Sequence, residues 1–181
     1  NYWFYYMLKY YLRSSIYLIA VYILLSSKFA FAGKITQVPA YDAPDLALQI
    51  YDGSRNYLSQ LEGRVVVLYF WATWCGHCVA NIPKLAKLQS QFNPKELIVV
   101  PVSIESGRLD HVKQFFKLRS DLQNLGVYID ADDVAASRFG ATSIPRAFII
   151  NKQGQVVAKV RGTMNWDSEE AVSMLKKLNG S

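Results

Sequence analysis

Two cysteines, Cys75 and Cys78, are the only ones in the 181-residue chain, and two residues separate them. They follow a continuous apolar run at residues 65–70 and open a stretch whose apolar residues have helical spacing. The first cysteine of such a pair meets free backbone N–H groups and the positive end of the helix dipole, which favour its thiolate. One helical turn brings the second sulfur within bonding distance. The spacing therefore predicts thiol–disulfide exchange, with Cys75 as the attacking thiol and Cys78 as the more buried resolving thiol.

Gly76 and His77 occupy the interval between the cysteines. An imidazole at this point can stabilise the Cys75 thiolate, in addition to the effect of the helix start. Stabilising the reduced form makes the corresponding disulfide a stronger oxidant. The alternative interpretation is that His77 is an exposed loop residue with no part in the chemistry.

A metal site is a weaker interpretation of the same residues. Structural zinc needs four ligands, and the chain offers two cysteines, His77 and His111. His77 lies inside the C-x-x-C turn, and His111 is expected on the polar face of a helix. We therefore expect no metal ion, and no cofactor other than the redox-active pair Cys75–Cys78.

Hydrophobic periodicity supplies the elements that position the two cysteines. Strands are expected at residues 46–51, 65–70, 97–104, 127–129, 147–150 and 156–160. Helices are expected at residues 78–91, 109–119, 132–139 and 169–178. The uninterrupted runs at 65–70 and 97–104 suit strands that are buried on both faces. Strands that alternate with helices predict an α/β fold.

The chain also contains Trp74 directly before the first cysteine, and Ser143-Ile144-Pro145 seventy residues later, ahead of another strand. In combination these motifs resemble the thioredoxin-like thiol–disulfide oxidoreductases. The segment at residues 103–130, with one helix and one strand, resembles the insert of the exported branch of that family, the TlpA and ResA group. The resemblance covers residues 43–178 and is closest to TlpA.

This resemblance implies a central mixed sheet flanked by helices, with a βα-type segment inserted between the C-x-x-C helix and the strand after Pro145. It also implies that Pro145 is cis and shapes a groove beside Cys75, while Ile144 offers its backbone to the substrate chain. Trp71 and Trp74 are expected to pack around the site, with Trp74 shielding Cys75.

Three residues depart from the family pattern. Tyr69 stands where thioredoxin has a buried acid, and Asn81 stands where ResA-like proteins have an acid three residues after the second cysteine. Either acid would help to move protons to and from the resolving thiol, so the proton path of this chain is unassigned. Arg146 stands where a small polar residue is common after the proline. It either favours an acidic partner surface or is a solvated edge charge.

The first 32 residues have the composition of an export segment. They hold eleven of the 25 aromatic residues and three basic residues, but no acidic residue. From Met7 onward a positive stretch is followed by an apolar run at residues 16–25 and an A-x-A motif that ends at Ala32, which is the layout of a cleavable secretory signal. An uncleaved membrane anchor is the alternative. Either would export the domain, with any cleavage near Ala32 and Gly33. The resemblance to TlpA implies that the destination is the bacterial periplasm.

Setting that segment aside changes the meaning of the net charge. The whole chain carries +6, but residues 33–181 carry only +3. A charge this small, spread over a domain, gives no basic stripe for nucleic acid, and membrane contact is expected only through the N-terminal segment. Residues 33–44 have no clear period and are expected to be a tether, with the thioredoxin-like domain at residues 45–181.

The expected function is an exchange of the Cys75–Cys78 pair with thiols or disulfides of protein substrates outside the cytoplasm. By resemblance, the clients are proteins whose cysteines must be reduced before they receive haem or copper, and a membrane redox donor recharges the pair. Two alternatives remain. His77 favours a disulfide oxidase or isomerase, and a thiol pair would also suit a copper-binding assembly chaperone.

The identity of the residues between the cysteines predicts the reduction potential. If His77 stabilises the Cys75 thiolate, the potential lies near roughly −200 mV, above the value of about −270 mV for thioredoxin. Equilibration with redox buffers of known potential measures it. A value below about −270 mV would contradict the role given to His77.

Overall fold

The computed structural model describes residues 2–3, 33–130, 132 and 134–180 of the chain. Contacts within the chain separate Asn1–Phe31 from Ala32–Ser181, and the second unit holds both cysteines. The signal or anchor expected at residues 1–32 lies outside the described residues, apart from Tyr2 and Trp3, and stays a prediction. No helix within the described ranges is both long and apolar enough to cross a membrane.

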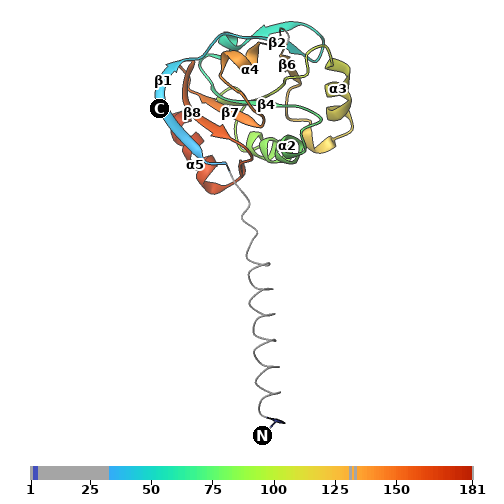
Figure 1. The fold of residues 1–181 in the computed structure, drawn as a ribbon. Coiled ribbons are helices and arrows are strands. Elements are labelled where there is room, and N and C mark those ends of the chain that lie inside the picture. The colour runs from blue at the N-terminus through green and yellow to red at the C-terminus, as the bar shows by residue number, and fades with distance from the viewer. Residues whose placement is uncertain (1, 4–32, 131, 133, 181) are drawn as a thin grey trace. The chain divides into compact units, whose positions relative to one another are not determined.

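Eight strands of the described residues form a single mixed sheet (Figure 1). In chain order they are β1 Ile35–Asp42, β2 Ala47–Ile50, β3 Arg55–Tyr57, β4 Val65–Trp71, β5 Leu97–Ser103, β6 Tyr128–Asp130, β7 Arg146–Ile150 and β8 Gln155–Arg161. Their order across the sheet is β1-β8-β7-β4-β5-β6-β2-β3. β5 is parallel to β4 and to β6, and the other pairs are antiparallel. The mixed α/β architecture expected from the sequence is therefore confirmed.

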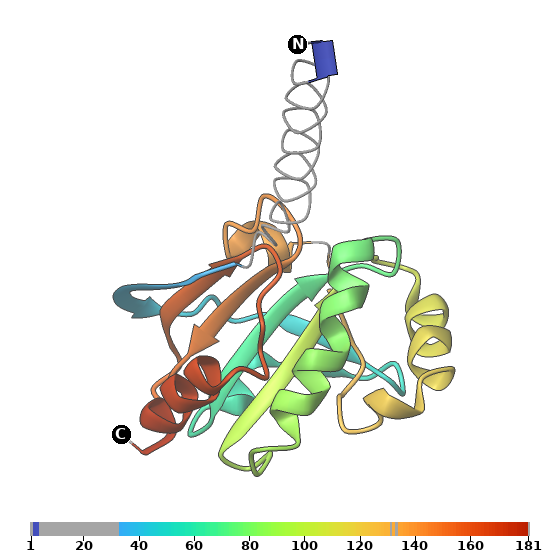
Figure 2. The same cartoon turned by 90° about the horizontal axis from the view of Figure 1, so that it is seen from below.

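Helices cover both faces of this sheet. They are α2 Gly76–Gln89, α3 Leu109–Lys117, α4 Ala135–Arg138 and α5 Glu169–Gly180, with the 3-10 turns η1 Leu58–Leu61 and η2 Ser120–Leu122. α2 and α5 lie against one face, the one toward the viewer in Figure 2, and α4 lies against the other. The insert ahead of β7 contains α3 and β6, as the resemblance implied.

Strand β4 lies at the centre of this arrangement because both of its faces are buried. Its odd-numbered side chains, from Val65 to Trp71, belong to the hydrophobic core that α2, α3 and α5 complete. Its even-numbered side chains, from Val66 to Phe70, belong to a second core that includes residues of α4. A strand with two buried faces is apolar throughout, which explains why the sequence identifies this strand so clearly.

The expected tether at residues 33–44 instead contributes β1 to the sheet. β1 pairs antiparallel with β8, with Ile35 opposite Val160, and the register shifts between Gln37 and Tyr41. Its side chains are exposed or half-buried. An edge strand interrupted by an irregularity has no steady alternation that a sequence could reveal. The tether interpretation is therefore wrong for most of this stretch.

The carboxylate of Asp130 joins β6 to α4. It is 1% exposed and accepts hydrogen bonds from three consecutive N–H groups at the start of the helix, those of Val134 at 3.2 Å, Ala135 at 2.7 Å and Ala136 at 3.4 Å. The ring of Phe139, directly after α4, lies 4.9 Å from the ring of Phe148 and 5.8 Å from that of Phe70. Asp130 therefore holds α4 against the centre of the sheet.

Replacing this acceptor should destabilise the domain. We expect Asp130→Ala to lower the free energy of unfolding by about 2 kcal/mol, because three N–H groups at the helix start, one of them buried, lose their partner, and urea unfolding measures the change. Asp132→Ala is the matched control, since Asp132 is 46% exposed and pairs with Arg55 at 3.1 Å. That variant should lose less than about 1 kcal/mol. Equal losses in the two variants would contradict the capping role.

Candidate active site

The two cysteines lie where β4 gives way to α2. Trp71 ends β4, and Cys75 is the residue that caps the N-terminus of α2. Cys75 and Cys78 form a disulfide with a Cα–Cα separation of 5.2 Å, and the Cys78 N–H donates to the Cys75 Sγ at 3.2 Å. Cys75 is half-buried, whereas Cys78 is fully buried. A partner that approaches from solvent therefore meets Cys75 first, as the roles expected from the sequence require.

Gly76 and His77 form the first turn of α2, and both are exposed. A Cβ atom added at Gly76 would have no neighbour within 4 Å. The chain between the two cysteines is therefore open to solvent at this position. The influence of His77 on the thiolate stays a prediction.

The pairing of β7 with β4 places Pro145 near the cysteine loop. The Ile144–Pro145 peptide bond is cis, as the resemblance implied. β7 starts at Arg146, which pairs with Phe70 of β4, so Pro145 lies at the sheet end from which the cysteine loop leaves. Pro145 is buried, and half-buried Ile144 packs on the same core as Cys75. The structure thus brings the proline and the cysteines together, while their contact with a substrate stays a prediction.

A buried carboxylate that the sequence analysis does not single out holds the loop before Cys75. Glu105 is 7% exposed. Its Oε2 accepts a hydrogen bond from the Thr73 N–H at 2.6 Å, and its Oε1 accepts one from the Thr73 hydroxyl at 2.8 Å. The Ser103 hydroxyl also donates to Oε2, at 3.1 Å. These charge-assisted bonds fix the backbone two residues ahead of the attacking cysteine.

The register of the parallel pair β4–β5 explains how Glu105 reaches that loop. Trp71, the last residue of β4, lies beside Ser103, the last residue of β5. Thr73 and Glu105 are therefore each two residues past the last residue of their strand, at the same end of the sheet. An acid just past the carboxyl end of a buried strand, next to the strand that leads to the C-x-x-C motif, is the signal that could have identified it.

The two positions at which the family pattern has acids are both buried and hydrogen-bonded. The Tyr69 hydroxyl donates to the Cys78 carbonyl at 3.3 Å, and burial raises the pKa of Tyr69 far above its ordinary value. The Asn81 amide donates to the Met164 carbonyl at 2.7 Å and accepts from the Met164 N–H at 3.0 Å. Tyr69 therefore stays protonated, and Asn81 ties α2 to the segment before α5. Neither side chain supplies a base for the resolving thiol.

The two tryptophans of the motif have different surroundings. Trp71 is fully buried, and its ring lies 5.0 Å from that of Phe115 and 5.9 Å from that of Phe116. Trp74 is 67% exposed, and its expected shielding of Cys75 stays a prediction. It presents its ring to solvent directly before Cys75. An exposed aromatic ring in that place offers apolar contact area to an incoming chain.

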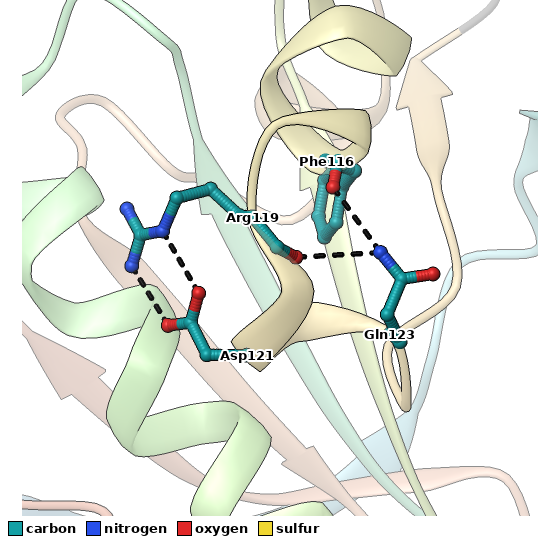
Figure 3. A network of polar contacts seen from close by, with 4 residues as sticks. All are labelled: Phe116, Arg119, Asp121 and Gln123. Atoms are coloured by element: carbon teal, nitrogen blue, oxygen red, sulfur yellow. Dashed lines mark hydrogen bonds and ion pairs between the residues drawn. The ribbon is translucent and has the colours of Figure 1, made fainter.

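A polar network holds the end of α3, the helix that covers Trp71 (Figure 3). Arg119 donates two hydrogen bonds of 2.9 Å to the Asp121 carboxylate, and these hold the pKa of Asp121 below its usual value. The Gln123 amide donates to the carbonyls of Phe116 and Arg119, at 3.4 and 3.3 Å. Because Phe116 packs on Trp71, the network supports the last residue before the cysteine loop.

Three other candidate residues are Arg146, His77 and His111. Arg146 is half-buried, its guanidinium carbon is 5.8 Å from the centre of the Phe148 ring, and burial lowers its pKa. His77 and His111 are both exposed. Within the described residues, no group of three or more His, Cys, Asp or Glu side chains is placed to hold a metal ion.

The chain is similar to a known family and to curated proteins. Residues 39–159 match the AhpC/TSA family. The thiol-disulfide oxidoreductase ResA of Bacillus subtilis is 34% identical over 134 residues, which are 74% of this chain and 73% of that protein. The protein of the same name from Geobacillus thermodenitrificans is 30% identical over 122 residues, or 67% and 68% of the two chains.

Solved structures show the same likeness. A candidate thiol:disulfide interchange protein DsbE from Chlorobium tepidum has a TM-score of 0.69 and 27% identity, covering 80% of this chain and all of the other. The exposed lipoprotein thioredoxin Etrx1 of Streptococcus pneumoniae has a TM-score of 0.60 and 25% identity, covering 74% and 99% of the two chains. The thioredoxin-like resemblance drawn from the sequence is thereby confirmed, and a closer likeness to TlpA than to ResA stays a prediction.

Neutralising the buried acid tests its hold on the loop. Glu105→Gln keeps the shape of the side chain but loses the charge-assisted bonds to Thr73. We expect the rate of exchange between the reduced protein and a small disulfide to fall roughly ten-fold, because the attacking sulfur is less well placed. Stopped-flow fluorescence measures the rate. Glu170→Gln, at an exposed position in the first turn of α5, is the control and should leave it unchanged. A loss of stability with an unchanged rate would make Glu105 purely structural.

Proposed function

The chain belongs to the AhpC/TSA family, and we propose that it acts outside the cytoplasm as a thiol–disulfide oxidoreductase on protein substrates. The observation that carries this activity is the disulfide between half-buried Cys75 and fully buried Cys78 at the N-terminus of α2. Relatives named thiol-disulfide oxidoreductases support the same reaction class. In the proposed reaction the cysteine pair itself is the redox group.

In the reductive direction, the dithiol form of the protein begins the cycle. The Cys75 thiolate attacks one sulfur of a client disulfide, the client S–S bond breaks, and the departing client thiolate takes up a proton. The mixed disulfide that results joins the client to Cys75. Cys78 then gives up its proton and attacks the Cys75 sulfur, which re-forms the Cys75–Cys78 disulfide and releases the second client thiolate. Two electrons pass from the protein to the client.

Local geometry favours the first of these steps. The N-terminus of a helix stabilises negative charge on Cys75, and the Cys78 N–H already donates to the Cys75 Sγ. Glu105 fixes the loop two residues before the sulfur. The cis bond between Ile144 and Pro145 frames the surface along which we propose that the extended client chain lies.

The proposal puts the domain in the bacterial periplasm. Residues 1–32 would direct export, either as a signal cleaved near Ala32 and Gly33 or as an anchor in the inner membrane. The order of positive stretch, apolar run and A-x-A motif supports export, as does the description of one similar structure as an exposed lipoprotein. Residues 45–181, together with β1, form the catalytic domain.

We further propose that the clients are proteins whose cysteines must be reduced before they receive haem or copper. The resemblance to the TlpA and ResA group supports this assignment. A membrane redox donor would return the Cys75–Cys78 disulfide to the dithiol. The opposite direction, oxidation or isomerisation of client disulfides, is the second candidate, and it is favoured by His77, which lies exposed between the two cysteines.

Trapping identifies the client and tests the mechanism together. In Cys78→Ser the mixed disulfide on Cys75 has no resolving thiol, so we expect disulfide-linked adducts that reducing agent releases and mass spectrometry names. Cys75→Ser lacks the attacking thiol and should form none. The same two substitutions should each lower insulin reduction to the uncatalysed rate.

The copper-binding alternative predicts a different result. A chaperone would bind copper stoichiometrically through the two thiols and would not turn over a disulfide substrate. Titration of the reduced protein with Cu(I), alongside the insulin assay, separates the two functions. Copper binding without turnover would contradict the oxidoreductase proposal.

A further inference from the structure

Three cationic side chains share one face of strands β7 and β8 at the sheet end that carries the redox pair. Arg146 and Arg161 are directly opposite each other in the antiparallel register, and Lys159 is opposite Phe148. Alternate residues of a strand point to the same face, so Arg146, Lys159 and Arg161 lie on the same side. Arg146 directly follows cis-Pro145. We call these three residues the cationic strip.

Two of the three cations of the strip, Arg146 and Lys159, lie near aromatic rings rather than near carboxylates. The guanidinium carbon of Arg146 lies 5.8 Å from the centre of the Phe148 ring, and the Lys159 Nζ lies 5.7 Å from the same ring. The Lys159 Nζ also lies 5.0 Å from the centre of the Tyr41 ring. In the described part of the chain, the ion pairs use other cations: Arg55, Lys87 and Arg119. The described residues therefore leave the charge of the strip uncompensated.

Such an arrangement is unfavourable for folding alone. Like charges directly opposite one another destabilise an antiparallel pair, and cation–π contacts offset this only in part. The Nε of Arg146 is also buried without a hydrogen-bond partner among the described residues, although a buried donor left unpaired costs free energy. Both burial and the nearby Arg161 lower the pKa of Arg146. The positive charge of Arg146 thus has no carboxylate partner within the described part of the domain.

We propose that the cationic strip receives an Asp or Glu side chain of the client polypeptide while the client cysteine lies at Cys75. This inference rests on the proposed function and names the kind of client that the site prefers: a protein whose reactive cysteine has acidic residues close to it in the chain. A planar carboxylate matches the forked donors of an arginine. A polypeptide is the expected occupant, because the strip directly follows the proline beside a site that exchanges protein thiols.

Matched peptides test this preference. Two disulfide-linked peptides would differ only in whether Glu or Gln flanks the cysteine, and kcat/KM for their reduction would be measured for each. We expect the wild-type protein to favour the Glu peptide by roughly five-fold or more at low salt, with the preference declining as salt rises. Arg161→Gln should reduce the ratio of the two values about five-fold, and Arg161→Glu should invert the preference.

The control variant carries the same loss of charge elsewhere. Lys176→Gln, on the exposed side of α5, should leave the ratio unchanged, which separates a local effect from one of net charge. Because Arg161 is exposed, its variants should fold, and circular dichroism checks this.

The outcomes for the strip and for the proposed function are distinct. If both peptides are reduced but Arg161→Gln and Arg161→Glu leave the ratio at the wild-type value, the strip is not a docking site and the oxidoreductase proposal stands. A ratio that falls equally in Lys176→Gln would also overturn the strip. If the wild-type protein reduces neither peptide, the proposed function itself is contradicted.

Discussion

The burial of β4 on both faces is the constraint on which the rest of the structure depends. A strand with apolar side chains above and below, and a paired strand along each edge, has no freedom to shift its register. Its neighbours are therefore set relative to its last residues: Trp71 lies beside Ser103 of β5, and Phe70 lies beside Arg146 of β7. These paired residues lie next to the cysteine loop, to Glu105 and to cis-Pro145 in the chain. A site assembled from three segments far apart in sequence thus owes its geometry to one buried strand.

The same constraint explains where polar groups are tolerated near the disulfide. Three buried polar side chains beside the site each have hydrogen-bond partners. Tyr69 donates to a backbone carbonyl, Asn81 pairs with both backbone groups of Met164, and Glu105 accepts from Thr73 and Ser103. Satisfied in this way, buried polar groups rigidify the loop rather than destabilise the core. The one acidic side chain among these three, that of Glu105, is the group that holds the cysteine loop.

Much of this could be predicted from the sequence, and the omissions have physical causes. Strong local signals come from the apolar runs that become β4 and β5, from the helical spacing of the buried residues of α2, and from the C-x-x-C spacing. β1 and β3 give none: β3 is three exposed residues, and β1 is an edge strand with a register shift. Glu105 escapes notice because it lies 30 residues beyond Cys75 in the chain and meets the loop only through strand pairing. The exposure of Trp74 also could not be predicted, because the aromatic character of a residue does not reveal that its side chain lies in solvent.

Exposed Trp74 and the cationic strip are both features that cost the isolated domain free energy. A large apolar ring in water and two arginines placed opposite each other are both unfavourable in the isolated domain, and both lie at the sheet end from which the cysteine loop leaves. On their other face, β7 and β8 pair apolar residues in the core, with Ala147 opposite Val160 and Ile149 opposite Ala158. Unfavourable features at the sheet end that carries the disulfide, in a domain that is otherwise well packed, are those expected of a surface whose partner is another polypeptide. The ring would be covered and the charges neutralised only while that chain is bound, so the disulfide site and its docking surface form a single unit.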